Sequence, residues 1–152
     1  MDDDVRTFGI ELGRAALARD WSAVHAMLAP WLRLSWSVGQ VQRFFEDEYR
    51  AMLEANGAEG LQYPEYPEPE VGGNDFTKAT QLREPISFAG GKVRDVPAEV
   101  SDENVRYWMK LQLQCSDEQM GSLGFDCFCE VWAALVETAE GLRVGYWSQG
   151  AY

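Results

Sequence analysis

Long stretches of alternating apolar and polar residues constrain this chain more than any other feature. From Val105 to Cys115 every second residue is apolar, and arginine, tryptophan, lysine and glutamine stand between them. A period of two with one apolar face is typical of a half-buried antiparallel strand. Residues 126–138 and 142–149 are two further strand-like segments, joined by a tight turn with a left-handed Gly141. We therefore expect three long strands of one antiparallel sheet.

The last two strands are predicted to be apolar on both faces. The expected register places Trp132, Ala134, Val136, Leu142, Val144 and Tyr146 on one face. The other face would carry Cys127, Cys129, Val131, Leu135 and Trp147, with Glu137 and Arg143 as a cross-strand pair. A sheet that is apolar on both sides needs two covers. We expect helices on one face, and a loop or another subunit on the other.

The N-terminal part of the chain has the apolar periodicity of helices. A first helix is predicted from about residue 3 to 18, behind a run of aspartates that suits the positive end of its dipole. Asp20 is a suitable N-cap for a second helix, which is expected to end or bend near Pro30. Ser37 begins a third helix with a capping-box spacing, and Asn56-Gly57 is a suitable stop.

The middle of the chain, residues 58–84, is expected to be a loop. Between residues 63 and 70, proline alternates with acidic and aromatic residues, which disfavours both helix and central strand. So long a loop is either an acidic surface segment without a task or a segment that presents side chains to a partner. The side chains that it would present are Tyr63, Glu65, Tyr66, Glu68 and Glu70. Beyond it, residues 85–89 and 92–96 are candidate strands of a hairpin around Gly90-Gly91.

Length and composition favour one soluble α+β domain over residues 1–152, with a helical half at 1–57 and the sheet within 85–152. No apolar run is long enough to span a membrane. The net charge of −12 disfavours nucleic acid and anionic lipid as partners. The charge either keeps the protein soluble or attracts a basic protein. Three cysteines behind an acidic N-terminus indicate reduced thiols in the cytoplasm.

The stretch from Ala18 to Pro30, with Arg19-Asp20 at its start, is followed by Ser37-Val-Gly-Gln-Val41 and by Phe44-Phe45. This order resembles the nuclear transport factor 2-like (cystatin-like) superfamily, in which a second helix follows such a step and ends in a proline. The resemblance implies a cone of three helices on a curved antiparallel sheet. Members of the superfamily include isomerases, dehydratases, polyketide cyclases, small-ligand binders and immunity proteins of bacterial toxin systems. The fold does not choose among these functions.

His25 is the only histidine and the one candidate catalytic residue. On the apolar stripe of the second helix it would serve either as a general base or as a core residue satisfied by one hydrogen bond. Tyr107, Asp126 and Tyr146 are candidate partners in a pocket. The chain lacks the motifs of serine hydrolases, phosphate-binding loops, zinc proteases and dinucleotide enzymes. No cofactor or metal is expected, because the C-x-C of Cys127 and Cys129 within a strand is unlike a zinc site.

Three functions follow from these features. The preferred one is a non-enzymatic protein-binding module, in its most concrete form an immunity-type protein that masks a basic partner. Beside the loop residues, Trp108 and Trp147 are predicted to be exposed anchors for that partner. The second is a small-molecule pocket protein, or an isomerase- or dehydratase-like enzyme with His25 as base. The third is a homodimer that pairs through the second apolar face of the sheet.

Overall fold

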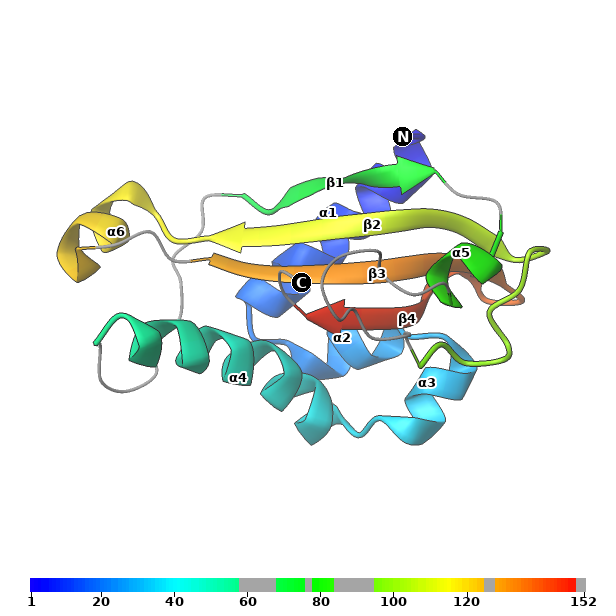
Figure 1. Ribbon diagram of the computed structural model, residues 1–152, viewed down its shortest axis with the longest axis horizontal. Helices are drawn as coiled ribbons and strands as arrows, with labels where there is room; N and C mark the ends of the chain where they lie inside the picture. Colours follow the sequence, from blue (N-terminus) through cyan, green and yellow to red (C-terminus); the bar gives the residue numbers. More distant parts are fainter. Residues whose placement is uncertain (58–67, 76–77, 84–94, 125–127, 150–152) are drawn as a thin grey trace.

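The computed structural model describes residues 1–57, 68–75, 78–83, 95–124 and 128–149, and it shows an α+β fold with N-terminal helices and an antiparallel sheet (Figure 1). The helices are α1 (Asp3–Leu17), α2 (Trp21–Ala26), α3 (Pro30–Ser35), α4 (Val38–Ala55), α5 (Thr80–Arg83) and α6 (Asp117–Leu123). The strands are β1 (Glu70–Asp75), β2 (Val105–Gln114), β3 (Phe128–Thr138) and β4 (Gly141–Gln149), in the spatial order β1-β2-β3-β4. In this described part no helix is long and apolar enough to cross a membrane.

Side chains cap the starts of α1, α2, α4 and α6. The side chain of Asp20 accepts from the backbone N–H of Ala23 at the start of α2, as predicted. Ser37 and Gln40 form the predicted capping box of α4, and Gly57 after its end has a φ of +78°. The single second helix is corrected to two short ones. Pro30 starts α3, because a proline fits the first turn, where its missing N–H is not needed.

Strand β1 lies inside the segment that was predicted to be a loop. It pairs with β2 at the edge of the sheet, so the sheet has four strands in the described residues instead of the predicted three. Gly73 has a φ of +125°, and a Cβ there would lie 2.0 Å from the carbonyl oxygen of Trp108. Only glycine allows the edge strand to approach β2 so closely. The candidate hairpin around Gly90-Gly91 lies outside the described residues.

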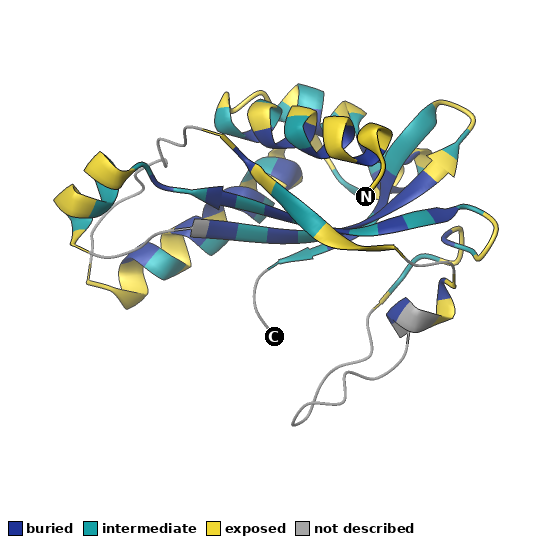
Figure 2. Cartoon of the chain, turned by 90° about the horizontal axis from the view of Figure 1, so that it is seen from above, coloured by how far each residue is buried: buried dark blue, intermediate teal, exposed yellow. Residues whose placement is uncertain are grey.

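The main core lies between the sheet and the helices α1, α2 and α4. Figure 2 shows α1 with its buried side against the sheet and its exposed side away from it. The helix-facing core residues of the strands are Tyr107, Met109, Leu111, Leu113, Cys129, Val131, Ala133, Leu135, Val144 and Trp147. Trp147 is only 4% exposed, so its predicted exposure is wrong. Its ring is stacked on Phe44 at 4.5 Å between ring centroids.

The opposite face of the sheet is partly covered by the chain itself. A second cluster there joins Ala79, Leu82 and Val100 to Val105, Ala134 and Val136. Beside it the rings of Trp108 and Trp132 stack at 5.6 Å, and those of Trp108 and Tyr146 at 6.3 Å. These rings pack on one another, which reduces the apolar surface that the face would otherwise expose.

The predicted register of β3 and β4 is right at Tyr146 and wrong from Val144 to the hairpin turn. Ala134 lies opposite Tyr146, but Leu135 lies opposite Val144, so the ladder contains a bulge at Gly145. The bulge turns Val144 toward the helices. It also places Glu137 opposite Leu142 instead of the predicted Arg143. A Cβ at Gly145 would lie 2.8 Å from a methyl of Val136, so the close approach needs glycine.

Candidate functional site

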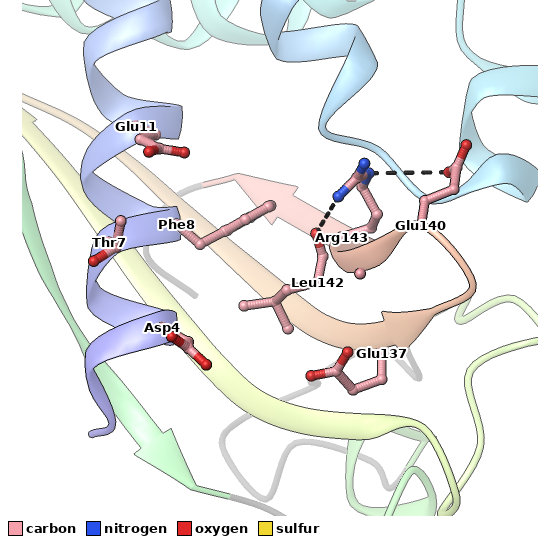
Figure 3. A pocket seen from close by; sticks show the side chains of 9 residues that line it. Asp4, Thr7, Phe8, Glu11, Glu137, Glu140, Leu142 and Arg143 are labelled. Atoms are coloured by element: carbon pink, nitrogen blue, oxygen red, sulfur yellow. Dashed lines mark hydrogen bonds and ion pairs between the residues drawn. The ribbon is translucent and has the colours of Figure 1, made fainter.

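A pocket of about 430 Å³ opens between α1 and the hairpin of β3 and β4 (Figure 3). Phe8 of α1 and Leu142 of β4 both extend into the space between the two elements and provide its apolar part. Carboxylates surround them from both elements. The lining residues are Asp4, Thr7, Phe8, Glu11, Glu137, Glu140, Gly141, Leu142 and Arg143. The pocket is therefore a mostly polar hollow with four carboxylates and two apolar side chains.

Local structure fixes both walls of the pocket. On α1, positions 4, 7, 8 and 11 lie on one side of the helix because they are three or four residues apart. The hairpin turn is held by Thr138, whose hydroxyl accepts from the N–H of Glu140 and donates to the carbonyl of Gly141. Gly141 has the predicted left-handed conformation, with a φ of +99°.

An ionic network joins Glu137, which lines the pocket, to the start of α1. Arg106 on β2 pairs with Glu137 and, at 2.5 Å, with Asp2. Asp2 also accepts from the N–H of Val5 as the N-cap of α1. This backbone hydrogen bond, followed by the one from Arg106, lowers the pKa of Asp2, and the bond to Asp2 raises the pKa of Arg106. The network ties the first turn of α1 to the sheet.

A second network holds Glu140, which also lines the pocket. The Nη2 of Arg33 donates to both carboxylate oxygens of Glu140, at 2.8 and 2.9 Å, and its Nη1 donates to the carbonyl of Leu28. Arg143 donates to the carbonyl of Leu142, and its Nε lies 3.9 Å from Glu140. Glu140 is thus shared by two guanidinium groups.

The two carboxylates on the α1 side of the pocket differ from those of the hairpin in their lack of partners. The side chains of Asp4 and Glu11 are exposed and form no hydrogen bond or ion pair in the described part of the chain. The carboxylates on the hairpin side of the pocket are therefore ion-paired, and those on the side of α1 have no ion pair within the described residues.

A separate group of polar side chains lies inside the core, between α4 and the sheet. Cys129 donates to Glu48 at 3.1 Å, and Glu48 also accepts from the N–H of Glu130. Burial raises the pKa of Glu48 and of the Cys129 thiol. The hydroxyl of Tyr49 lies 2.8 Å from the sulfur of Cys115, and burial raises the pKa of Tyr49. A thiol and a phenol that resist ionisation are poor nucleophiles, so this group is suited to packing.

The expectation that the cysteines are all reduced thiols is wrong. Cys115 is disulfide-bonded, whereas Cys129 is a buried free thiol. A disulfide-bonded sulfur has no proton, so the hydroxyl of Tyr49 is the donor to Cys115. The third cysteine, Cys127, lies outside the described residues. No three histidine, cysteine or acidic side chains within the described ranges are grouped so as to hold a metal ion.

The candidate catalytic residue His25 links two helical segments. Its Nε2 lies 2.7 Å from the carbonyl oxygen of Trp36, which can only accept, so Nε2 carries the proton. His25 does not line the pocket beside α1. Tyr107 lies in the helix-facing core and Tyr146 on the other face, so the predicted pocket residues are not brought together. Asp126 lies outside the described residues.

The predicted partner-binding residues are scattered. Glu68 pairs with Arg14 of α1 at 3.3 Å, and Glu70 starts β1 opposite Gln112. Trp108 is half-buried in the stack on the outer face, and Trp147 is buried in the core. Tyr63, Glu65 and Tyr66 lie outside the described residues. The two described tryptophans lie on opposite faces of the sheet, since Trp147 belongs to the helix-facing core and Trp108 packs beside the cluster on the other face.

The sequence held one signal of the pocket that was missed. Asp4, Thr7 and Glu11 are polar positions that flank the apolar stripe of α1 at helical spacing. The hairpin wall has no such signal, because its position against α1 depends on the tertiary packing. Comparison with family models, with curated proteins and with solved structures finds no match to this chain.

Proposed function

We propose that this protein is a non-enzymatic protein-binding module that binds a basic partner with the pocket between α1 and the β3–β4 hairpin. One observation carries the proposal: the pocket sets two apolar side chains, Phe8 and Leu142, among four carboxylates that come from two elements. An apolar centre with a charged rim is the usual composition of a protein interface. The net charge of −12 would also speed the encounter with a partner of opposite charge.

The concrete form of this proposal is an immunity-type protein that masks a basic toxin domain. The resemblance of the helical part to the nuclear transport factor 2-like superfamily supports this form, since immunity proteins are among its members. The α+β arrangement, with N-terminal helices on an antiparallel sheet, is in keeping with that superfamily.

The other two functions have less support. A general base must lie within reach of a substrate, and His25 does not line the pocket between α1 and the β3–β4 hairpin. The homodimer would use the second face of the sheet, where Ala79, Leu82 and Val100 already cover part of the apolar surface.

The experiment measures binding to the basic proteins encoded beside this chain's gene, at increasing NaCl concentration. We expect an affinity that falls with salt, because exposed charges are screened. Thr7→Arg, which places a cation in the pocket, should weaken binding about tenfold, the equivalent of 1.4 kcal/mol. Thr80→Arg makes the same charge change at an exposed position of α5 and is the matched control. No binding, or equal losses in the two variants, would contradict the proposal.

A further inference from the structure

We propose that α1 selects the partner by recognising two positively charged side chains about 10 Å apart on one helix of that partner, with Asp4 and Glu11 as the specificity-determining residues. The inference rests on the proposed function and defines the chemistry of the partner. Its first support is the distribution of charge in the pocket.

The hairpin wall offers little to an incoming cation. Glu137 is paired with Arg106, and Glu140 with Arg33 and Arg143. A partner would have to displace an internal guanidinium to reach either carboxylate. Asp4 and Glu11 have no such internal partner in the described residues, so their negative charge is available. Incoming cations should therefore pair with α1.

The spacing of these two carboxylates limits the shape of the partner. Seven residues along an α-helix advance by about 10 Å and return to nearly the same side. On a partner helix, residues seven apart match this distance and also share a face. On an extended strand, three residues span about 10 Å, but their side chains point to opposite faces, and residues two or four apart span about 7 or 13 Å. The geometry favours a helix with two basic residues seven positions apart.

The space between the carboxylates indicates what separates the two cations. Phe8 lies between Asp4 and Glu11 along α1 and extends toward the hairpin that carries Leu142 (Figure 3). The pocket volume of about 430 Å³ has room for side chains but not for a helix backbone. The partner helix would lie across the opening and insert an apolar side chain between its two basic residues.

The test uses alanine-rich helical peptides that carry two arginines, spaced either seven or four residues apart. Both peptides have the same charge, so nonspecific attraction to the acidic chain is matched. Binding is followed by NMR titration of the α1 amide signals at low salt. We expect the seven-residue spacing to bind about fivefold to tenfold more tightly, as two exposed ion pairs allow. Equal affinity of the two peptides would overturn the inference.

A second part of the experiment replaces the carboxylates of Asp4 and Glu11. The preference for the seven-residue spacing should disappear in Asp4→Asn/Glu11→Gln and persist in Asp3→Asn/Glu118→Gln, which removes two exposed charges outside the pocket. A charge-reversed protein, Asp4→Lys/Glu11→Lys, should bind a peptide with two glutamates seven residues apart. The control Asp3→Lys/Glu118→Lys has the same net charge and should not bind it.

The outcomes separate this inference from the proposed function. If a basic partner binds and Thr7→Arg weakens it, but peptide spacing has no effect, the inference is wrong and the proposed function stands. If neither the basic proteins nor any arginine peptide binds, both are wrong. Equal losses in the pocket variant and its control would show attraction by net charge alone, which also overturns the inference.

Discussion

Glu48 illustrates how a single residue links the helical layer to the sheet. It is a carboxylate of α4 that accepts from the thiol of Cys129 and from the backbone N–H of Glu130 in β3. Burial raises its pKa above the ordinary value of 4.5. The cost of burying the charge is only partly offset by the two hydrogen bonds. Glu48 therefore connects two elements but weakens the fold when it is ionised.

This raised pKa makes the stability depend on pH in a defined direction. A group with a higher pKa in the folded state stabilises that state fully below its unfolded pKa, and this contribution is lost as the pH rises through the folded pKa. Glu48→Gln keeps an acceptor and removes the charge. We expect the variant to unfold at higher urea concentration than the parent at pH 7, and the difference to shrink toward pH 4. Urea unfolding at both pH values measures this.

The control for that measurement is Glu54→Gln, a charge removal at an exposed position of the same helix. Its effect should be smaller than that of Glu48→Gln at pH 7. A gain for Glu48→Gln that is the same at pH 4 and pH 7 would show that repacking, and not ionisation, is responsible.

At the scale of elements, contact between α1 and the sheet depends on two glycines. A Cβ at Gly9 would lie 2.7 Å from a methyl of Val71, and a Cβ at Gly13 would lie 2.4 Å from Pro69. Distances below 3.0 Å are shorter than real contacts of a Cβ, so a larger residue must push the elements apart. The two glycines set how closely α1 approaches the β1 edge, and so they help to set the width of the pocket.

Gly13→Ala should therefore destabilise the protein although alanine is the better helix former. The overpacking should lower the free energy of unfolding by about 1–3 kcal/mol. Gly121→Ala in α6 is the matched control, because no atom lies within 4 Å of its Cβ position. There the helix propensity acts alone and should raise the stability by about 0.5–1 kcal/mol. Chemical denaturation measures the free energy of unfolding of both variants. If Gly13→Ala is more stable than the parent, Pro69 can move away from the added methyl group at little cost, and the prediction is wrong.

Local signals in the sequence predicted most helix ends and the long strands. Asp20 and Ser37 cap helices because their side chains act on neighbouring N–H groups, which the sequence alone reveals. The bulge at Gly145 could not be predicted, since it depends on the close approach of Val136 across the hairpin. For the same reason Val144 was assigned to the wrong face. Strand β1 was missed because its glycines favour a loop until β2 provides a partner.

For the whole molecule, the acidic balance affects stability as well as binding. A net charge of −12 on a chain of 152 residues produces repulsion that favours expansion. The ionic networks of Arg106 and Arg33 oppose it locally. The candidate site was beyond prediction at this scale, because α1 and the hairpin meet only after the sheet has formed. The net charge was evident from the composition. The composition did not show that the carboxylates of the hairpin are ion-paired whereas Asp4 and Glu11 of α1 are not.

Added salt should consequently raise the melting temperature by several degrees, because screening weakens the net repulsion more than the exposed ion pairs. The measurement compares thermal unfolding at low and at about 0.5 M NaCl, where the screening length is a few ångströms. Asp3→Lys/Glu118→Lys, which makes the net charge less negative, should show a smaller rise in melting temperature. A melting temperature that falls with salt would mean that the internal ion pairs outweigh the repulsion.

The dependence of α1 on the strands has a consequence for synthesis of the chain. Gly9 packs against Val71 and Met109, and Gly13 lies beside Pro69 and Leu111. On a ribosome that adds about 5–20 residues per second, α1 emerges several seconds before β2. A chain interrupted before Val105 would expose the apolar stripe of α1 with nothing to receive it. Nascent chains of this protein should therefore be substrates for chaperones until the second half of the sequence has been translated.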